Sequence, residues 1–174
     1  MVGDRPMPTD VSLAVARHVP VQPSSRALSS LGRIDYEDAF VIGMPPGQAV
    51  PATDWAKAAL EGATSRLGRE LWSALATIGV LPRAQPARSE RVIVGWAVRR
   101  ATPEVAVLAA DAPLGLCAEL LFETRQRIIR WSTFVQLDTA PARAAWAVLA
   151  PVHRRVVTYL LERVVRLDLD APLE

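Results

Sequence analysis

The chain has 174 residues, 51% of them hydrophobic and 22% charged, and a net charge of +2. This length suits one domain with a terminal extension, and no apolar run reaches the roughly 18–20 residues that span a bilayer. One cysteine and two histidines exclude a disulfide framework and argue against a multi-cysteine or histidine-rich metal centre, so we expect no metal and no cofactor.

The first 32 residues are rich in proline and serine and predict a flexible arm with little structure of its own. This stretch also lacks the continuous apolar region of a signal peptide, which makes a cytoplasmic location the expectation. No tight basic tract or basic-aromatic motif points to nucleic acid.

A first strand is predicted after the arm. Ile34, Tyr36, Phe40 and Ile42 recur with a period of two, and Asp38 falls on the same apolar face. Two short helices should follow. The first is entered at Trp55, and the second begins near residue 65 and ends before residue 82.

Four consecutive strands are predicted next, within residues 92–98, 104–110, 116–122 and 129–137. The turns between them are short, which joins antiparallel neighbours. The pattern then changes to one long amphipathic helix that ends near Leu169. Asp138 or Thr139 can cap it, Pro141 sits in its first turn, and Pro151 should bend it near residue 147.

This order of elements predicts an α+β fold in which a curved antiparallel sheet grips the long C-terminal helix. The predicted domain spans residues 33–170. Such an arrangement leaves room for a cavity between the sheet and the helix.

The hexapeptide DYEDAF at 35–40 and the stretch from Trp146 to the PVHR tetrapeptide at 151–154 resemble the bacterial DUF2867 family. That family belongs to the START-like, or helix-grip, superfamily, and the similarity covers roughly residues 33–168. The resemblance implies the same helix-grip fold. Members of the wider superfamily bind hydrophobic ligands or act as polyketide cyclases, whereas DUF2867 itself has no known function and implies no catalytic residues.

His153 and Asp38 are the candidate catalytic residues. His153 lies on the apolar stripe of the terminal helix, where an imidazole facing a cavity can act as a general base. Asp38 must be paired or neutralised if it is buried, because an isolated buried charge is costly. A structural histidine and a structural ion pair are the competing interpretations.

Aromatic and apolar side chains of the inward faces are the candidate ligand-binding residues. With His153 they are Tyr36, Trp96, Phe122, Trp131, Trp146 and Leu149. The same residues could instead fill an ordinary core. Cys117 lies on the opposite strand face and is not a candidate nucleophile.

Three functions are compatible with this pattern. The first is binding of a small hydrophobic or amphipathic molecule between sheet and helix, which we favour. The second is a cyclase-like or isomerase-like enzyme that uses His153 and Asp38. The third is a ligand-free module that forms a homodimer through the outer sheet face, which carries Arg130, Phe134, Gln136, Glu119, Leu121, Ile128 and Ser132.

Overall fold

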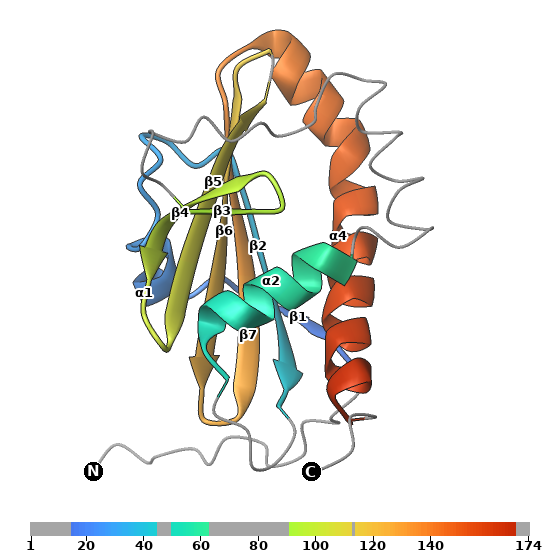
Figure 1. Cartoon of the computed structure of the whole chain (residues 1–174). Helices are drawn as coiled ribbons and strands as arrows, with labels where there is room; N and C mark the ends of the chain where they lie inside the picture. The colour runs from blue at the N-terminus through green and yellow to red at the C-terminus, as the bar shows by residue number, and fades with distance from the viewer. Residues whose placement is uncertain (1–14, 45–49, 63–90, 113, 170–174) are drawn as a thin grey trace, which may run out of the picture.

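The computed structural model describes residues 15–44, 50–62, 91–112 and 114–169, with side chains to residue 166. The strands are β1 (Arg17–Val19), β2 (Tyr36–Gly43), β3 (Val92–Ile93), β4 (Trp96–Ala101), β5 (Val105–Ala112), β6 (Leu116–Arg125) and β7 (Ile128–Leu137). The helices are α1 (Pro23–Arg26), α2 (Ala52–Gly62) and α4 (Ala140–Leu169). The strands form one curved antiparallel sheet in the order β1-β2-β7-β6-β5-β4-β3, with α2 and α4 on one side of it (Figure 1). The predicted α+β fold with a C-terminal helix is confirmed.

The predicted strand over residues 92–98 is in fact a tight hairpin. β3 and β4 are joined by Val94 and Gly95, which have φ angles of 47° and 82°, and Ile93 pairs directly with Trp96. Positive φ at both central residues gives a turn whose twist matches that of the flanking strands. A β-branched valine is an unusual residue for this turn, so the β-branched run from Val92 to Val94 concealed it. Five strands therefore replace the four that were predicted between residues 91 and 137.

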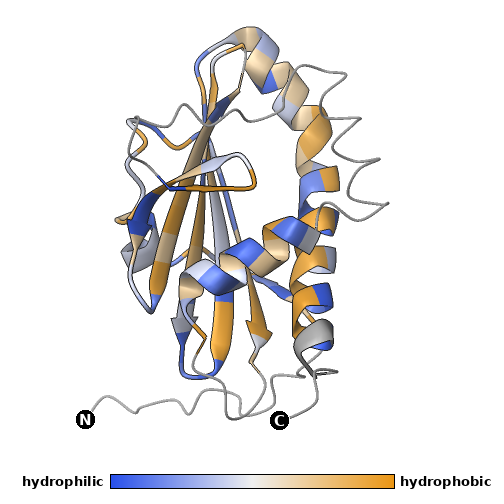
Figure 2. Cartoon of the chain, in the orientation of Figure 1, coloured by the Kyte–Doolittle hydropathy of each residue, from blue (hydrophilic) through white to orange (hydrophobic). Residues whose placement is uncertain are grey.

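α2 begins earlier than the sequence predicted. The backbone N–H groups of Asp54 and Trp55 both donate to the carbonyl of Pro51, so the helix starts just after this proline and not at Trp55. The helix turns an apolar face toward the sheet, with Ala52, Trp55, Ala56, Ala59 and Leu60 buried. Its exposed side is mostly hydrophilic, whereas the strands are largely hydrophobic (Figure 2). The second predicted helix, from about residue 65, lies outside the described residues.

α4 closes the inner face of the sheet. The Thr139 hydroxyl accepts a hydrogen bond from the Ala142 N–H at 3.2 Å, so Thr139 caps the helix as predicted. Pro151 lies inside the helix, which is visibly curved in Figure 1, consistent with the predicted bend. No helix of the described residues combines the length and the hydrophobicity that crossing a bilayer requires.

The N-terminal segment covers the outer face of the sheet, so the prediction of an arm with little structure of its own fails for residues 15–32. Apolar side chains from both layers meet there: Val21, Leu28, Leu31 and Ile34 pack on buried Val105, Val107, Leu121 and Phe134. Burial of this apolar surface gives the segment a physical reason to fold, which its proline and serine content alone did not reveal.

Two buried glutamates hold the same segment in place. The Ser25 hydroxyl donates to Glu123 at 2.5 Å, and the hydroxyls of Ser29 and Ser30 both donate to Glu119. Glu119 and Glu123 are only 1% and 6% exposed. Of the outer-face residues that could support a homodimer, Glu119, Leu121, Ser132 and Phe134 are therefore already buried within the chain.

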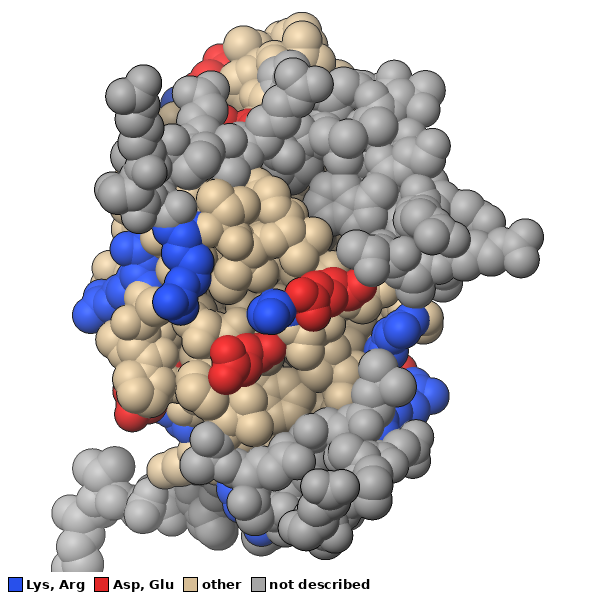
Figure 3. Space-filling view, in the orientation of Figure 1, with Lys and Arg blue, Asp and Glu red and all other residues tan. Residues whose placement is uncertain are grey.

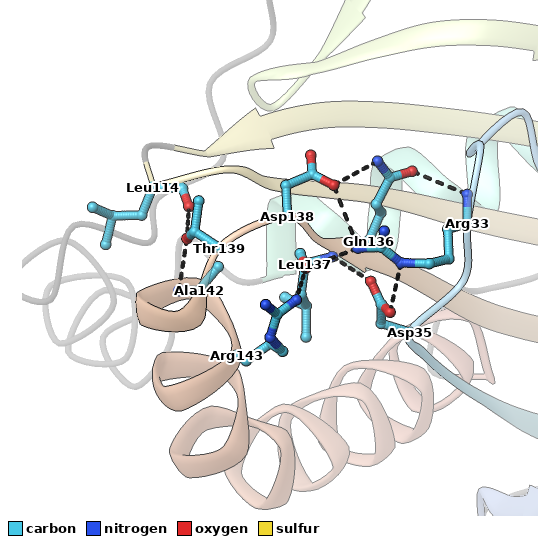
Figure 4. Close-up of polar contacts among 9 residues, drawn as sticks. All are labelled: Arg33, Asp35, Leu114, Gln136, Leu137, Asp138, Thr139, Ala142 and Arg143. Carbon is cyan, nitrogen blue, oxygen red and sulfur yellow. Dashed lines mark hydrogen bonds and ion pairs between the residues drawn. The ribbon is translucent and has the colours of Figure 1, made fainter.

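The start of the domain is also tied to the junction between β7 and α4 (Figure 4). The Asp35 carboxylate accepts a hydrogen bond from the Leu137 N–H at 2.7 Å, while Arg33 and Arg143 donate to the Leu137 carbonyl at 2.9 and 2.7 Å. The guanidinium of Arg33 holds the pKa of Asp35 below its usual range. These contacts fix the position of the junction where β7 ends and α4 begins.

Candidate functional site

The inward face of the sheet carries an aromatic floor. The Phe122 and Trp131 rings lie on neighbouring strands with their centroids 4.6 Å apart, and their side chains are 0% and 2% exposed. Trp96 and Leu149 are buried in the same core. Four of the candidate ligand-binding residues are therefore closely packed. The other three, Tyr36, Trp146 and His153, are half-buried.

Polar groups gather beside this floor, where β2 and β7 face α4. Asp38 and Thr133 are directly paired across the two strands. His153 Nε2 lies 3.5 Å from Asp38 Oδ2 and 3.2 Å from the Thr133 hydroxyl, and the Tyr36 hydroxyl donates to Asp38 Oδ2 at 2.5 Å. We call Tyr36, Asp38, Thr133, Trp146 and His153 the inner polar cluster. The structure thus brings together the two candidate catalytic residues.

Aromatic rings hold the cluster from the helix side. The Trp146 ring packs against the rings of Tyr36 and His153, with centroid distances of 5.0 and 5.5 Å. Because Trp146 and His153 are seven residues apart, two helical turns place them on one side of α4. The predicted orientation of both residues toward the sheet is confirmed.

Arg154 stands at the exposed rim of the cluster. Its Nε donates to the Tyr36 hydroxyl at 3.1 Å, and its guanidinium carbon lies 5.7 Å from the centre of the Tyr36 ring. The positive charge therefore lies near the buried carboxylate without contacting it. The contact to Tyr36 joins α4 to a strand more than a hundred residues earlier in the chain, so local sequence periodicity does not reveal it.

Asp38 is ionised despite its burial. Burial alone would raise the pKa of Asp38. The hydrogen bond and electrostatic attraction of His153, together with hydrogen bonds from Tyr36 and Thr133, outweigh burial and hold the pKa below its usual value. Burial and the bond to Asp38 raise the pKa of Tyr36 to about 12, so the phenol keeps its proton and remains a donor. In the tautomer that donates from His153 Nε2 to the facing carboxylate, Nδ1 is left as an acceptor.

Two polar atoms of the cluster have no partner among the described residues. The Asp38 side chain is only 1% exposed, and its Oδ1 is fully buried and accepts no hydrogen bond from the described residues. The indole N–H of Trp146 is buried and donates none. Buried polar atoms are paired in most native structures, so an unused acceptor and an unused donor in one cluster require an explanation.

Thr133 was missed as a site residue although the sequence contained a signal. It is the polar break in the inward series Trp131, Thr133, Val135, as Asp38 is the polar break in the first strand. Two such breaks on strands that pair directly indicate a shared polar site.

Cys117 lies apart from the inner polar cluster. Burial together with Asp111 raises the pKa of its thiol to about 11, which keeps the thiol protonated and unreactive.

Two pockets lined by described residues lie elsewhere. One, of about 320 Å³, is bounded by α2 and the β3–β4 hairpin, and the other, of about 230 Å³, lies at the turn between β6 and β7. Acidic and basic side chains alternate over α2, where Lys57 and Glu61 form an ion pair at 3.9 Å (Figure 3). Within the part of the chain that the structure describes, no three histidine, cysteine or acidic residues are placed to hold a metal ion.

The fold and the cluster define a class: an α+β domain with a helix-covered antiparallel sheet and a contact between a buried aspartate and a half-buried histidine. Comparison of the chain with known protein families, with curated proteins and with solved structures finds no match. The resemblance to the DUF2867 family therefore stays a prediction.

Proposed function

We propose that this protein binds a small amphipathic molecule at the inner polar cluster, with the half-buried rings of Tyr36 and Trp146 against the apolar part of the ligand. One observation carries the proposal: a buried, ionised carboxylate oxygen and a buried indole N–H both lack partners among the residues that the structure describes, in a cluster that is partly open to solvent. A ligand with one polar end would use both atoms. Binding sites of this kind join apolar walls to a few fixed polar groups.

Fluorescence of the neutral dye N-phenyl-1-naphthylamine tests the proposal. Binding should enhance dye emission and quench the protein's tryptophans. Trp146→Phe keeps an aromatic ring but removes the N–H. It should weaken binding of 2-acetylnaphthalene, whose carbonyl is an acceptor and whose binding is measured by displacement of the dye, by up to about tenfold. Val148→Ala is the matched control, because Val148 lies two residues further along α4 and is 73% exposed.

Native mass spectrometry of freshly purified protein provides a second, independent measurement. A small molecule that co-purifies with the wild type and is lost in Trp146→Phe, but not in Val148→Ala, would support the site. Wild-type protein that carries no small molecule and leaves the dye emission unchanged would refute the proposal.

The contact between Asp38 and His153 favours a second candidate function, acid–base catalysis of the cyclase or isomerase type. Asp38 would fix the imidazole so that Nδ1 can accept a proton from a carbon next to a carbonyl. Incubation with phenylacetone in D₂O, followed by proton NMR, tests this chemistry. Exchange of the methylene protons that is lost in His153→Gln supports it, and exchange at the uncatalysed rate in wild type contradicts it.

A further inference from the structure

The chemistry of the unused Asp38 oxygen limits what the ligand can be. Oδ2 already receives the Tyr36 hydroxyl and faces His153 Nε2, whereas Oδ1 receives nothing from the described residues. A carboxylate oxygen without a proton can only accept hydrogen bonds. The group that meets Oδ1 must therefore be a donor, and a ligand carboxylate or phosphate in that position would be repelled.

The charges around Asp38 also argue against a cationic ligand. The groups that face the carboxylate are Tyr36 from β2, Thr133 from β7, and His153 with Arg154 from α4. Arg154 already places a permanent positive charge at the rim, where it lies over the Tyr36 ring. An ammonium group entering past that guanidinium would meet like charge, which offsets its attraction to the carboxylate.

We infer that the ligand presents a neutral hydroxyl to Asp38 Oδ1, and that the protein is therefore selective for alcohols or phenols with an apolar body. This inference rests on the proposed function and names its ligand class. A neutral hydroxyl satisfies the buried oxygen without adding charge. Hydrogen bonds to a charged acceptor are stronger than those between neutral groups, which gives the hydroxyl its advantage over an ether of the same shape.

A series of probes with one apolar body tests the inference by isothermal titration calorimetry at pH 7. The probes are 2-naphthol, 2-methoxynaphthalene, 2-naphthoate and protonated 2-(aminomethyl)naphthalene. Wild type should bind 2-naphthol at least about tenfold more tightly than each of the other three. This comparison needs no substitution, so it does not depend on any variant folding.

Asp38→Asn locates the effect. In this variant the preference for 2-naphthol over 2-methoxynaphthalene should fall to about threefold or less, because a neutral acceptor replaces a charged one. Glu61→Gln is the control, since it also removes one carboxylate but on the exposed side of α2, and it should leave the preference unchanged.

The outcomes separate this inference from the proposed function. Equal binding of 2-naphthol and its ether, or tightest binding of the naphthoate or the ammonium probe, overturns the hydroxyl inference while leaving a ligand site in place. An unchanged preference in Asp38→Asn also overturns it. Failure of all four probes to bind wild type refutes the inference and counts against the proposed function as well.

Discussion

Replacement of Trp131 measures how closely the aromatic floor is packed. The ring is 2% exposed and its centroid lies 4.6 Å from that of Phe122, so Trp131→Ala removes a fully buried indole. Truncations of this kind cost about 3–5 kcal/mol, and loss of the aromatic pair lies within that range. A ring bordering an open pocket would cost distinctly less, because fewer of its contacts would be lost.

Trp131→Phe separates packing from hydrogen bonding. The Trp131 N–H is buried and has no partner among the described residues. Phenylalanine removes this unpaired donor, which by itself costs about 1–3 kcal/mol to bury, while keeping most of the apolar contact. We therefore expect the phenylalanine variant to lie within about 1.5 kcal/mol of wild type, far from the alanine variant.

Urea unfolding followed by far-ultraviolet circular dichroism gives both free energies, and the slope m of each transition checks that the two variants unfold as wild type does. An alanine variant that loses less than about 1 kcal/mol would show that the floor is loosely packed. A phenylalanine variant as unstable as the alanine variant would show instead that the indole N–H has a partner that stabilises the fold.

Three further predictions concern stability. Ser25→Ala leaves buried Glu123 short of a donor and should cost about 1–3 kcal/mol in urea unfolding, whereas an alanine at the exposed preceding serine should cost less than about 0.5 kcal/mol. Gly115→Ala should destabilise by about 1–3 kcal/mol in the same assay, because φ is +77° there and the new Cβ would lie 3.1 Å from the side chain of the capping threonine; a neutral effect would contradict this geometry. Since the pKa of Asp38 is lower in the folded state, its contribution is present above about pH 4 and is lost as the pH falls through the folded-state value. The stability difference between wild type and Asp38→Asn, measured by urea titrations between pH 6 and pH 3, should shrink toward the acid end, and a constant difference would refute the assignment.

The inward face of the sheet was readable from the sequence because its physical signal is local. Alternation along β2 and β7 placed Asp38 and Trp131 on one face, and the helical stripe placed Trp146 and His153 toward them. The structure confirms this arrangement. What periodicity could not supply was distance, so the contact of His153 Nε2 with Asp38 emerged only from the strand register and the curvature of α4.

The outer face was misread for a different reason. A segment rich in proline and serine has weak local preferences, and its structure comes from contacts with strands about 90 residues later in the chain. Buried Glu119 offered a hint, since an acidic residue on a strand between apolar neighbours requires donors from somewhere. The sequence alone does not say that those donors are serines near the N-terminus.

The N-terminal segment that covers the outer face of the sheet, residues 15–32, has a consequence for the order in which the fold assembles during synthesis. Ser25 leaves the ribosome first, yet its partner Glu123 follows 98 residues later, so the cover stays without a docking site while most of the chain is being made. Closing so long a loop is entropically costly and therefore slow. β6 and β7, which are joined by a short turn, can pair well before the N-terminal segment docks. A nascent chain would therefore pass through a stage in which Leu121 and Phe134 are open to water, the stage at which chaperone capture or self-association would compete with maturation.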